Sequence, residues 1–120
     1  MKENVIKTKS YAFALRVIKL YKFLCEEKRE FVLSKQLLRS GTSVGANIEE
    51  ADAGQSKRDF IAKLQISLKE AKESHYWIRL LKDSDFIDEK MAVSFLTDCN
   101  EIIAILTSIL KSAKNANDEK

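Results

Sequence analysis

The chain has 120 residues, of which 32% are charged and 45% are apolar, and it contains three glycines and no proline. This length suits one domain with a single core, and the balance of apolar and charged residues argues against a disordered chain. Hairpins depend on glycine and other turn residues, so their scarcity argues against a β-rich fold. No apolar run approaches the roughly 18 uncharged residues of a membrane span, and no signal peptide is visible. We therefore expect a cytoplasmic helical protein without membrane contact.

Positive charge is concentrated in the first third of the chain. Residues 1–39 hold ten Lys or Arg and four Asp or Glu, a net charge of +6, within a total of +3 for the whole chain. Residues 40–120 are therefore net acidic. This basic segment is the compositional indication of a polyanionic partner.

Apolar residues at helical spacing predict four helices. The first covers about residues 3–27, and its apolar arc is wide enough to contact two neighbouring helices. The second starts with Ser34 as its N-cap and ends near Gly54, which would adopt the left-handed conformation that closes many helices.

Small residues fill one side of the second helix. Gly41 and Gly45 each cost a helix about 1 kcal/mol relative to alanine, so a close approach of another helix must offset them. The seam of this helix advances in steps of four and three residues, as in a helix buried in a bundle. Its members are Leu37, Gly41, Val44, Ile48 and Ala51.

Two further helices carry recognisable start signals. Ser56 and Asp59 match a capping pattern at the start of the third helix. Phe86 and Ile87 are expected to staple the turn before Asp88, the predicted N-cap of the fourth helix.

Short connections force neighbouring helices to run in opposite directions. The sequence therefore predicts an all-α fold, an up-down-up-down antiparallel four-helix bundle. Residues 1–113 would form this single domain, and residues 114–120 a polar, disordered tail.

The segment from Gln36 to Ala51 reads QLLRSGTSVGANIEEA. It resembles Q-L-R-R-A-x-x-S-I-x-A-N-I-A-E-G, the core pattern of the four-helix-bundle proteins first noticed as open reading frames in intervening sequences of bacterial 23S ribosomal RNA genes. Ser56, Phe60 and Leu64 also match the family's S-x-x-x-F-x-x-x-L, and the likeness spans about residues 5–112. The chain departs from the pattern where Leu38 replaces the first of two paired arginines and where Glu49-Glu50-Ala51 replaces Ala-Glu-Gly.

The resemblance implies an assembly more than an activity. Members of this family look like homopentamers arranged as a short barrel, and most standalone members have no established activity. A related branch, the accessory proteins of diversity-generating retroelements, binds reverse transcriptase and nucleic acid through a basic surface. The wide apolar arcs predict a homo-oligomer, and the resemblance implies that it is a pentamer. We expect no cofactor.

The family motif singles out the polar residues Arg39, Asn47, Glu50 and Glu73. Because buried charges require partners, we expect each to pair with the third helix or with another subunit. The alternative makes Glu50 and Glu73 a catalytic acid and base. No nucleophile, second histidine or glycine-rich phosphate loop accompanies them, so we predict no catalytic residue and no enzyme.

A metal site is not expected either. Ferritin-like bundles use Glu-x-x-His, whereas Glu70 and Glu73 precede His75 by five and two residues. Cys25 and Cys99 fall on apolar helix positions and are expected to be buried thiols, neither a disulfide nor a metal pair.

Basic residues gather on the arc of the first helix opposite its apolar stripe. This arc, extended across the turn into the second helix, supplies the candidate nucleic-acid-binding residues Lys9, Arg16, Lys19, Lys22, Lys35 and Arg39. The arc is also typical of an ordinary solvated helix face. In a ring of five copies, however, the charges of five modest basic patches add to a strong positive field. The affinity for phosphates also rises steeply with the number of contacts.

Two functions remain open on the sequence alone. The first is a non-enzymatic, oligomeric bundle that binds RNA or DNA, or a nucleic-acid-associated protein, through this basic surface. The second is a structural or protein-interaction module, for example a reverse-transcriptase accessory partner, whose basic helix is only solvated.

Overall fold

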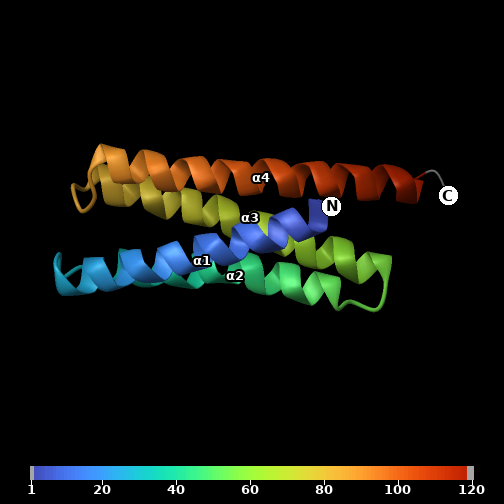
Figure 1. Cartoon of the computed structure of the whole chain (residues 1–120), viewed down its shortest axis with the longest axis horizontal. Coiled ribbons are helices and arrows are strands. Elements are labelled where there is room, and N and C mark those ends of the chain that lie inside the picture. The colour runs from blue at the N-terminus through green and yellow to red at the C-terminus, as the bar shows by residue number, and fades with distance from the viewer. Residues whose placement is uncertain (1, 119–120) are drawn as a thin grey trace.

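A computed structural model describes residues 2–118, and these form four antiparallel helices within an elongated molecule of 53 × 22 × 21 Å (Figure 1). The helices are α1 (Lys2–Glu26), α2 (Leu33–Asp52), α3 (Lys57–Asp83) and α4 (Glu89–Asp118). The α1–α2 and α3–α4 loops lie at one end of the bundle, and the α2–α3 loop lies at the other (Figure 1). The predicted up-down-up-down bundle is confirmed.

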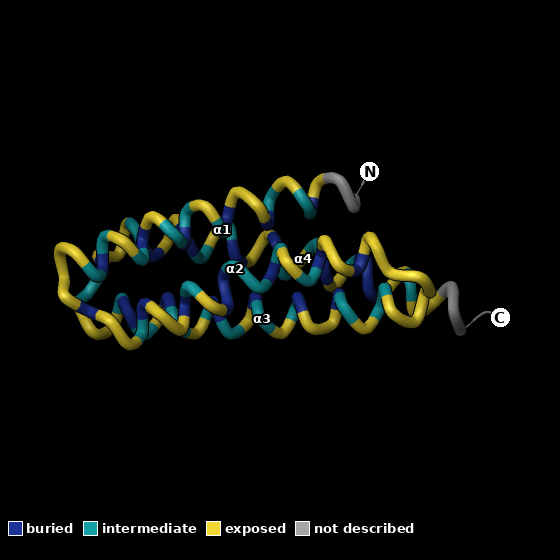
Figure 2. Tube along the Cα trace, turned by 90° about the horizontal axis from the view of Figure 1, so that it is seen from below, coloured by how far each residue is buried: buried dark blue, intermediate teal, exposed yellow. Residues whose placement is uncertain are grey.

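Each helix turns one stripe of apolar side chains inward, and the buried positions face the interior of the bundle (Figure 2). Phe13 of α1 meets Phe95 of α4 edge to face, with ring centroids 6.5 Å apart. The largest fully buried aliphatic side chains are Ile6, Leu24, Leu37, Leu64, Ile78, Leu81, Ile102 and Leu106. This continuous core is what holds the outward-facing residues in fixed positions.

The glycines of α2 admit α1, as the spacing predicts. A Cβ atom added at Gly41 would lie 2.9 Å from Cγ2 of Val17, and one added at Gly45 would lie 3.3 Å from Oγ of Ser10. The backbones of α1 and α2 therefore approach more closely than larger side chains would permit.

Two predicted caps are confirmed. Ser56 Oγ accepts a hydrogen bond from the backbone N–H of Asp59 at 3.0 Å, and Asp88 Oδ1 accepts one from Met91 at 2.7 Å. Both bonds satisfy N–H groups that a helix start would otherwise leave without partners.

The predicted end of α2 near Gly54 is confirmed, but two predicted details of its termini are wrong. Ser34 is not the N-cap residue, because it is fully buried inside the first turn; the N-cap position is Val32, and the carboxylate that accepts from the first N–H groups is that of Glu30. Gly54 is not left-handed, since no glycine of the described residues has a positive φ. The left-handed residues are instead Arg29, with φ 55°, and Asp85, with φ 67°.

The fourth helix is longer than predicted. It continues through residue 118, beyond the predicted domain end at residue 113, so the predicted disordered tail is helical over residues 114–118, while residues 119–120 lie outside the described part. By length and composition alone α4 could cross a membrane. A third of its apolar window is buried within the bundle. Seven of its side chains lie in the core: Ala92, Phe95, Cys99, Ile102, Leu106, Ile109 and Leu110.

Candidate functional site

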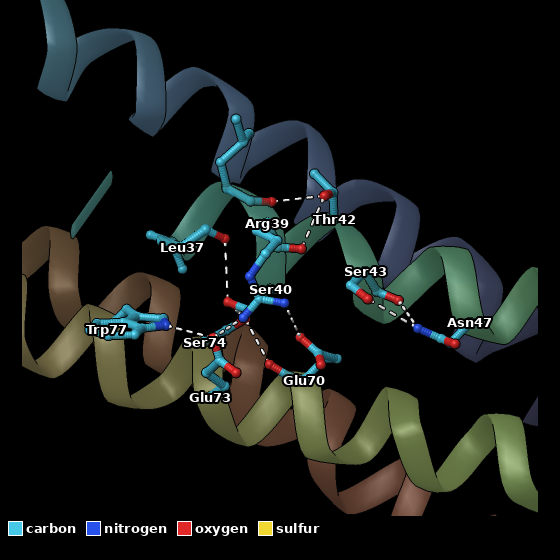
Figure 3. A network of polar contacts seen from close by, with 11 residues as sticks. Leu37, Arg39, Ser40, Thr42, Ser43, Asn47, Glu70, Glu73, Ser74 and Trp77 are labelled. Carbon is cyan, nitrogen blue, oxygen red and sulfur yellow. Dashed lines mark hydrogen bonds and ion pairs between the residues drawn. The ribbon is translucent and has the colours of Figure 1, made fainter. Parts of the chain in front are cut away.

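A polar network joins the family-motif segment of α2 to the middle of α3 (Figure 3). The guanidinium of Arg39 forms ion pairs with Glu73 and, at 3.4 Å, with Glu70. Trp77 Nε1 donates to the same Glu73 carboxylate at 2.9 Å. The Trp77 hydrogen bond is the largest influence on Glu73 and, together with Arg39, outweighs the effect of burial and holds its pKa below the usual value. The two ion pairs of Arg39 therefore connect α2 to α3.

Beneath this network, small hydroxylated residues let α2 and α3 approach closely. Ser40 and Ser74 share a hydrogen bond of 2.9 Å between their buried hydroxyls (Figure 3). Ser67 donates to the carbonyl of Val44 at 2.8 Å, across the same interface. These bonds satisfy polar groups that would otherwise be costly to bury. The motif segment thus specifies a tight helix pair.

The remaining motif residues do not converge on this network. Glu50 pairs with Lys63 at 2.8 Å. Asn47 donates within its own helix to the carbonyl and hydroxyl of Ser43, at 2.9 and 3.0 Å, and not to a residue of α3, one of the two partners expected for it (Figure 3). Arg39 and Glu50 are eleven positions apart, which corresponds to about 16 Å along a helix. The structure therefore does not bring Glu50 together with the acid that pairs with Arg39.

The described residues contain no group of side chains suited to bind a metal ion. Within residues 2–118, no three His, Cys, Asp or Glu side chains gather closely enough to hold a metal ion. Cys99 is buried, and its thiol donates to the carbonyl of Ala71 at 3.1 Å. Burial raises the pKa of this thiol to about 12, which keeps it protonated and unreactive at neutral pH.

The basic arc of α1 divides into two halves. In the first half, Lys9 forms an ion pair with Glu101 at 2.8 Å, and Arg16 forms one with Asp98 at 2.6 Å. The Arg16 guanidinium also lies 4.1 Å from the ring centroid of Phe95. Both basic residues therefore already have partners on α4, and the arc is less open to an external anion here than a helical wheel suggests.

The second half of the arc is free. Lys19, Lys22 and Lys35 are exposed, and no ion pair involves them within the part of the chain that the structure describes. These lysines lie toward the α1–α2 loop, which adds Lys28 and Arg29, also exposed. The candidate residues predicted from the sequence do not include Lys28 and Arg29, although these two continue the run of basic residues.

A comparison with known proteins identifies the family. The sequence profile described as 23S rRNA-intervening sequence protein matches residues 2–108. The chain belongs to this family. No curated protein matches it.

A solved structure supports the family assignment and the fold. It is the crystal structure of a protein of unknown function from the S23 ribosomal protein family of Bacteroides thetaiotaomicron VPI-5482. The two chains share 54% sequence identity over 92% of this chain and 99% of the other, with a TM-score of 0.92. At this identity and coverage, the two chains share the same fold over nearly their whole length.

Proposed function

We propose that this family member is a non-enzymatic, self-associating helical bundle that binds nucleic acid through the basic residues beside the α1–α2 loop. The supporting observation is the division of the arc. Lys9 and Arg16 are neutralised by carboxylates of α4, whereas Lys19, Lys22 and Lys35 have no acidic partner among the described residues. Exposed cations without acidic partners are the groups that exchange counterions for phosphates.

Self-association is proposed because α1 retains apolar surface that the bundle does not cover. Tyr11 and Leu15 are 66% and 49% exposed. They border a groove of about 350 Å³ between α1 and α2, whose lining includes Gly45 and Ala46. A helix of a second copy is the occupant we expect, since small residues permit close packing and apolar patches of this kind mark interaction sites. The pentameric state is carried over from the family resemblance.

Fluorescence anisotropy across a salt series tests nucleic-acid binding. The variant Lys19→Glu/Lys22→Glu/Lys35→Glu should abolish binding to labelled RNA and duplex DNA. The control Lys57→Glu/Lys72→Glu/Lys111→Glu carries the same change in charge at other exposed positions and should weaken binding far less. For duplex DNA, losing each phosphate contact should reduce the magnitude of the log–log salt slope by about one unit.

Two results would contradict the proposal. Absence of wild-type binding at low salt would leave the protein-interaction function in its place. Equal losses in the triple variant and its control would mean that only total charge matters and that this surface has no special role. Light scattering at micromolar concentration checks assembly separately, and a monomeric mass would refute self-association.

A further inference from the structure

The α1–α2 loop is held rigidly by one buried carboxylate. Glu30 is 9% exposed, and its Oε2 accepts hydrogen bonds from the backbone N–H groups of Val32 and Leu33 at 3.1 and 3.0 Å. Its Oε1 accepts another from Ser34 at 2.7 Å, and the Ser34 hydroxyl donates back to the Glu30 carbonyl at 2.7 Å. Three N–H groups at the start of α2 are therefore already bonded to this carboxylate, whose negative charge would repel an external phosphate there.

This rigid loop presents two large apolar side chains to solvent. Phe31 is 53% exposed and Val32 is 70% exposed. Val32 is the N-cap residue of α2, so Phe31 occupies the position of a hydrophobic staple, whose partner would be the fourth helical residue. That residue is the exposed, polar Gln36, which offers no apolar contact. Neither helix capping nor core packing accounts for an aromatic ring at this position.

One cation lies near the exposed ring, and two more belong to the same stretch of chain. The guanidinium carbon of Arg29 lies 5.8 Å from the Phe31 ring centroid. Lys28 precedes Arg29 in the same loop, and Lys35 follows in the first turn of α2; both are exposed. The nearby Glu26 and Glu27 are also exposed and moderate the field. An exposed aromatic ring with several cations within one short loop is the combination by which proteins hold single-stranded nucleic acid, since bases stack on the ring and phosphates pair with the cations.

We propose that Phe31 is a stacking platform for an unpaired nucleobase, so that the α1–α2 loop directs this protein to single-stranded nucleic acid over duplex. This inference rests on the proposed nucleic-acid function and adds the class of nucleic acid and the residue that selects it. In a duplex the bases are stacked on each other and cannot reach an isolated ring, whereas the lysines can contact the phosphates of either form. Membrane insertion is less well supported, because two apolar side chains bury little area and stable anchoring requires more than one weak signal.

The test compares anisotropy titrations with a labelled 20-nucleotide single-stranded RNA and a duplex of the same length. Phe31→Leu retains an apolar side chain but loses the aromatic face. It should weaken single-strand binding about fivefold or more, on the scale of one lost base stack, and leave duplex binding unchanged within about twofold. Phe31→Trp should retain wild-type single-strand affinity. Tyr76→Leu removes another exposed aromatic ring, on α3, and should change neither affinity.

The outcomes separate this inference from the function on which it rests. Wild-type binding of duplex as tight as that of single strand, or equal affinities of wild type and Phe31→Leu for the single strand, would overturn the stacking role and leave the lysine surface intact. Wild-type binding of neither probe would overturn both. Vesicles containing phosphatidylserine serve as the membrane probe. If Phe31→Leu still binds these vesicles and the protein shows no preference for single strands, the loop would be assigned to a lipid surface instead.

Discussion

The two loops at the same end of the bundle are built alike but bury their apolar residues to different extents. Each contains a non-glycine residue with positive φ, an aromatic–aliphatic pair and an acidic residue that caps the next helix. In the α3–α4 loop, Ile87 is 6% exposed and lies at the staple position of α4, whose fourth residue, Ala92, is fully buried. In the α1–α2 loop the equivalent pair, Phe31 and Val32, points to solvent.

The difference separates a loop that serves the fold from one that is open to a partner. The α3–α4 loop is fixed by its apolar pair and its cap together. The α1–α2 loop is fixed by the Glu30 carboxylate and by backbone hydrogen bonds such as that from Glu30 N–H to the carbonyl of Leu24 at 2.9 Å, and its apolar pair contributes little to the core. Charge differs as well. The α3–α4 loop contains Asp85 and Asp88 and no basic residue, whereas in the α1–α2 loop Lys28 and Arg29 balance Glu27 and Glu30.

The largest expected effect on stability comes from removing the buried side chain of Ile87. Ile87→Ala should lower the free energy of unfolding by about 2–4 kcal/mol, because it deletes buried methyl groups and leaves a cavity. Urea denaturation followed by circular dichroism measures the change. A loss in the free energy of unfolding below about 1 kcal/mol would mean that the α3–α4 loop contributes no more to the core than the α1–α2 loop does.

The next effect concerns the cap on which the α1–α2 loop depends. Glu30→Ala should cost about 1–2 kcal/mol, since three backbone N–H groups lose their acceptor. Asp88→Ala removes a cap with one such bond and should cost less, about 1 kcal/mol. The same denaturation experiment compares the two, and an equal or greater loss in Asp88→Ala would refute the special dependence on Glu30.

Sequence periodicity predicted the bundle because each helix has one apolar stripe, and local capping patterns predicted Ser56 and Asp88 correctly. The capping patterns failed at Ser34. A serine near a helix start is the commoner cap, and no local feature of the sequence shows that the longer side chain of Glu30, four residues upstream, reaches those N–H groups. A helical wheel also cannot show that Lys9 meets Glu101 on a distant helix. Such pairs depend on the rotation of α1 within the bundle.

The same limit applies to the candidate site. The family motif singled out Arg39 and Glu73 without predicting that they pair with each other, and the structure places them in one ion pair. Phe31 attracts no attention in the sequence, because one aromatic residue between two helices is ordinary. Its exposure is known only from the three-dimensional structure.

The third prediction is a pH dependence that belongs to the α1–α2 loop. Burial opposes the charge on Glu30, but hydrogen bonds from the backbone N–H groups of Leu33, Ser34 and Val32 together outweigh it and lower the pKa of Glu30 below its ordinary value of 4.5. A lowered native pKa contributes stability that is complete above the unfolded value and is lost as the pH falls through the native value. Glu30→Gln should therefore be less stable than wild type by up to about 1 kcal/mol at pH 7, and the difference should shrink below pH 4.5. Urea denaturation at several pH values measures it, and a constant difference between pH 3 and pH 7 would contradict the role of the charge.

The smallest expected effect on stability is the most informative for function. Phe31→Ala should change the free energy of unfolding by no more than about 0.5 kcal/mol, because the ring is half exposed and its staple position lacks an apolar partner. Thermal denaturation of Phe31→Ala beside Ile87→Ala measures the contrast directly. If Phe31→Ala approached the loss of Ile87→Ala, the ring would be part of the core and both loops would serve the fold. If its stability is unchanged, the ring is free to contact a partner, and any loss of single-strand binding in Phe31 variants reflects the contact itself, because the fold is intact.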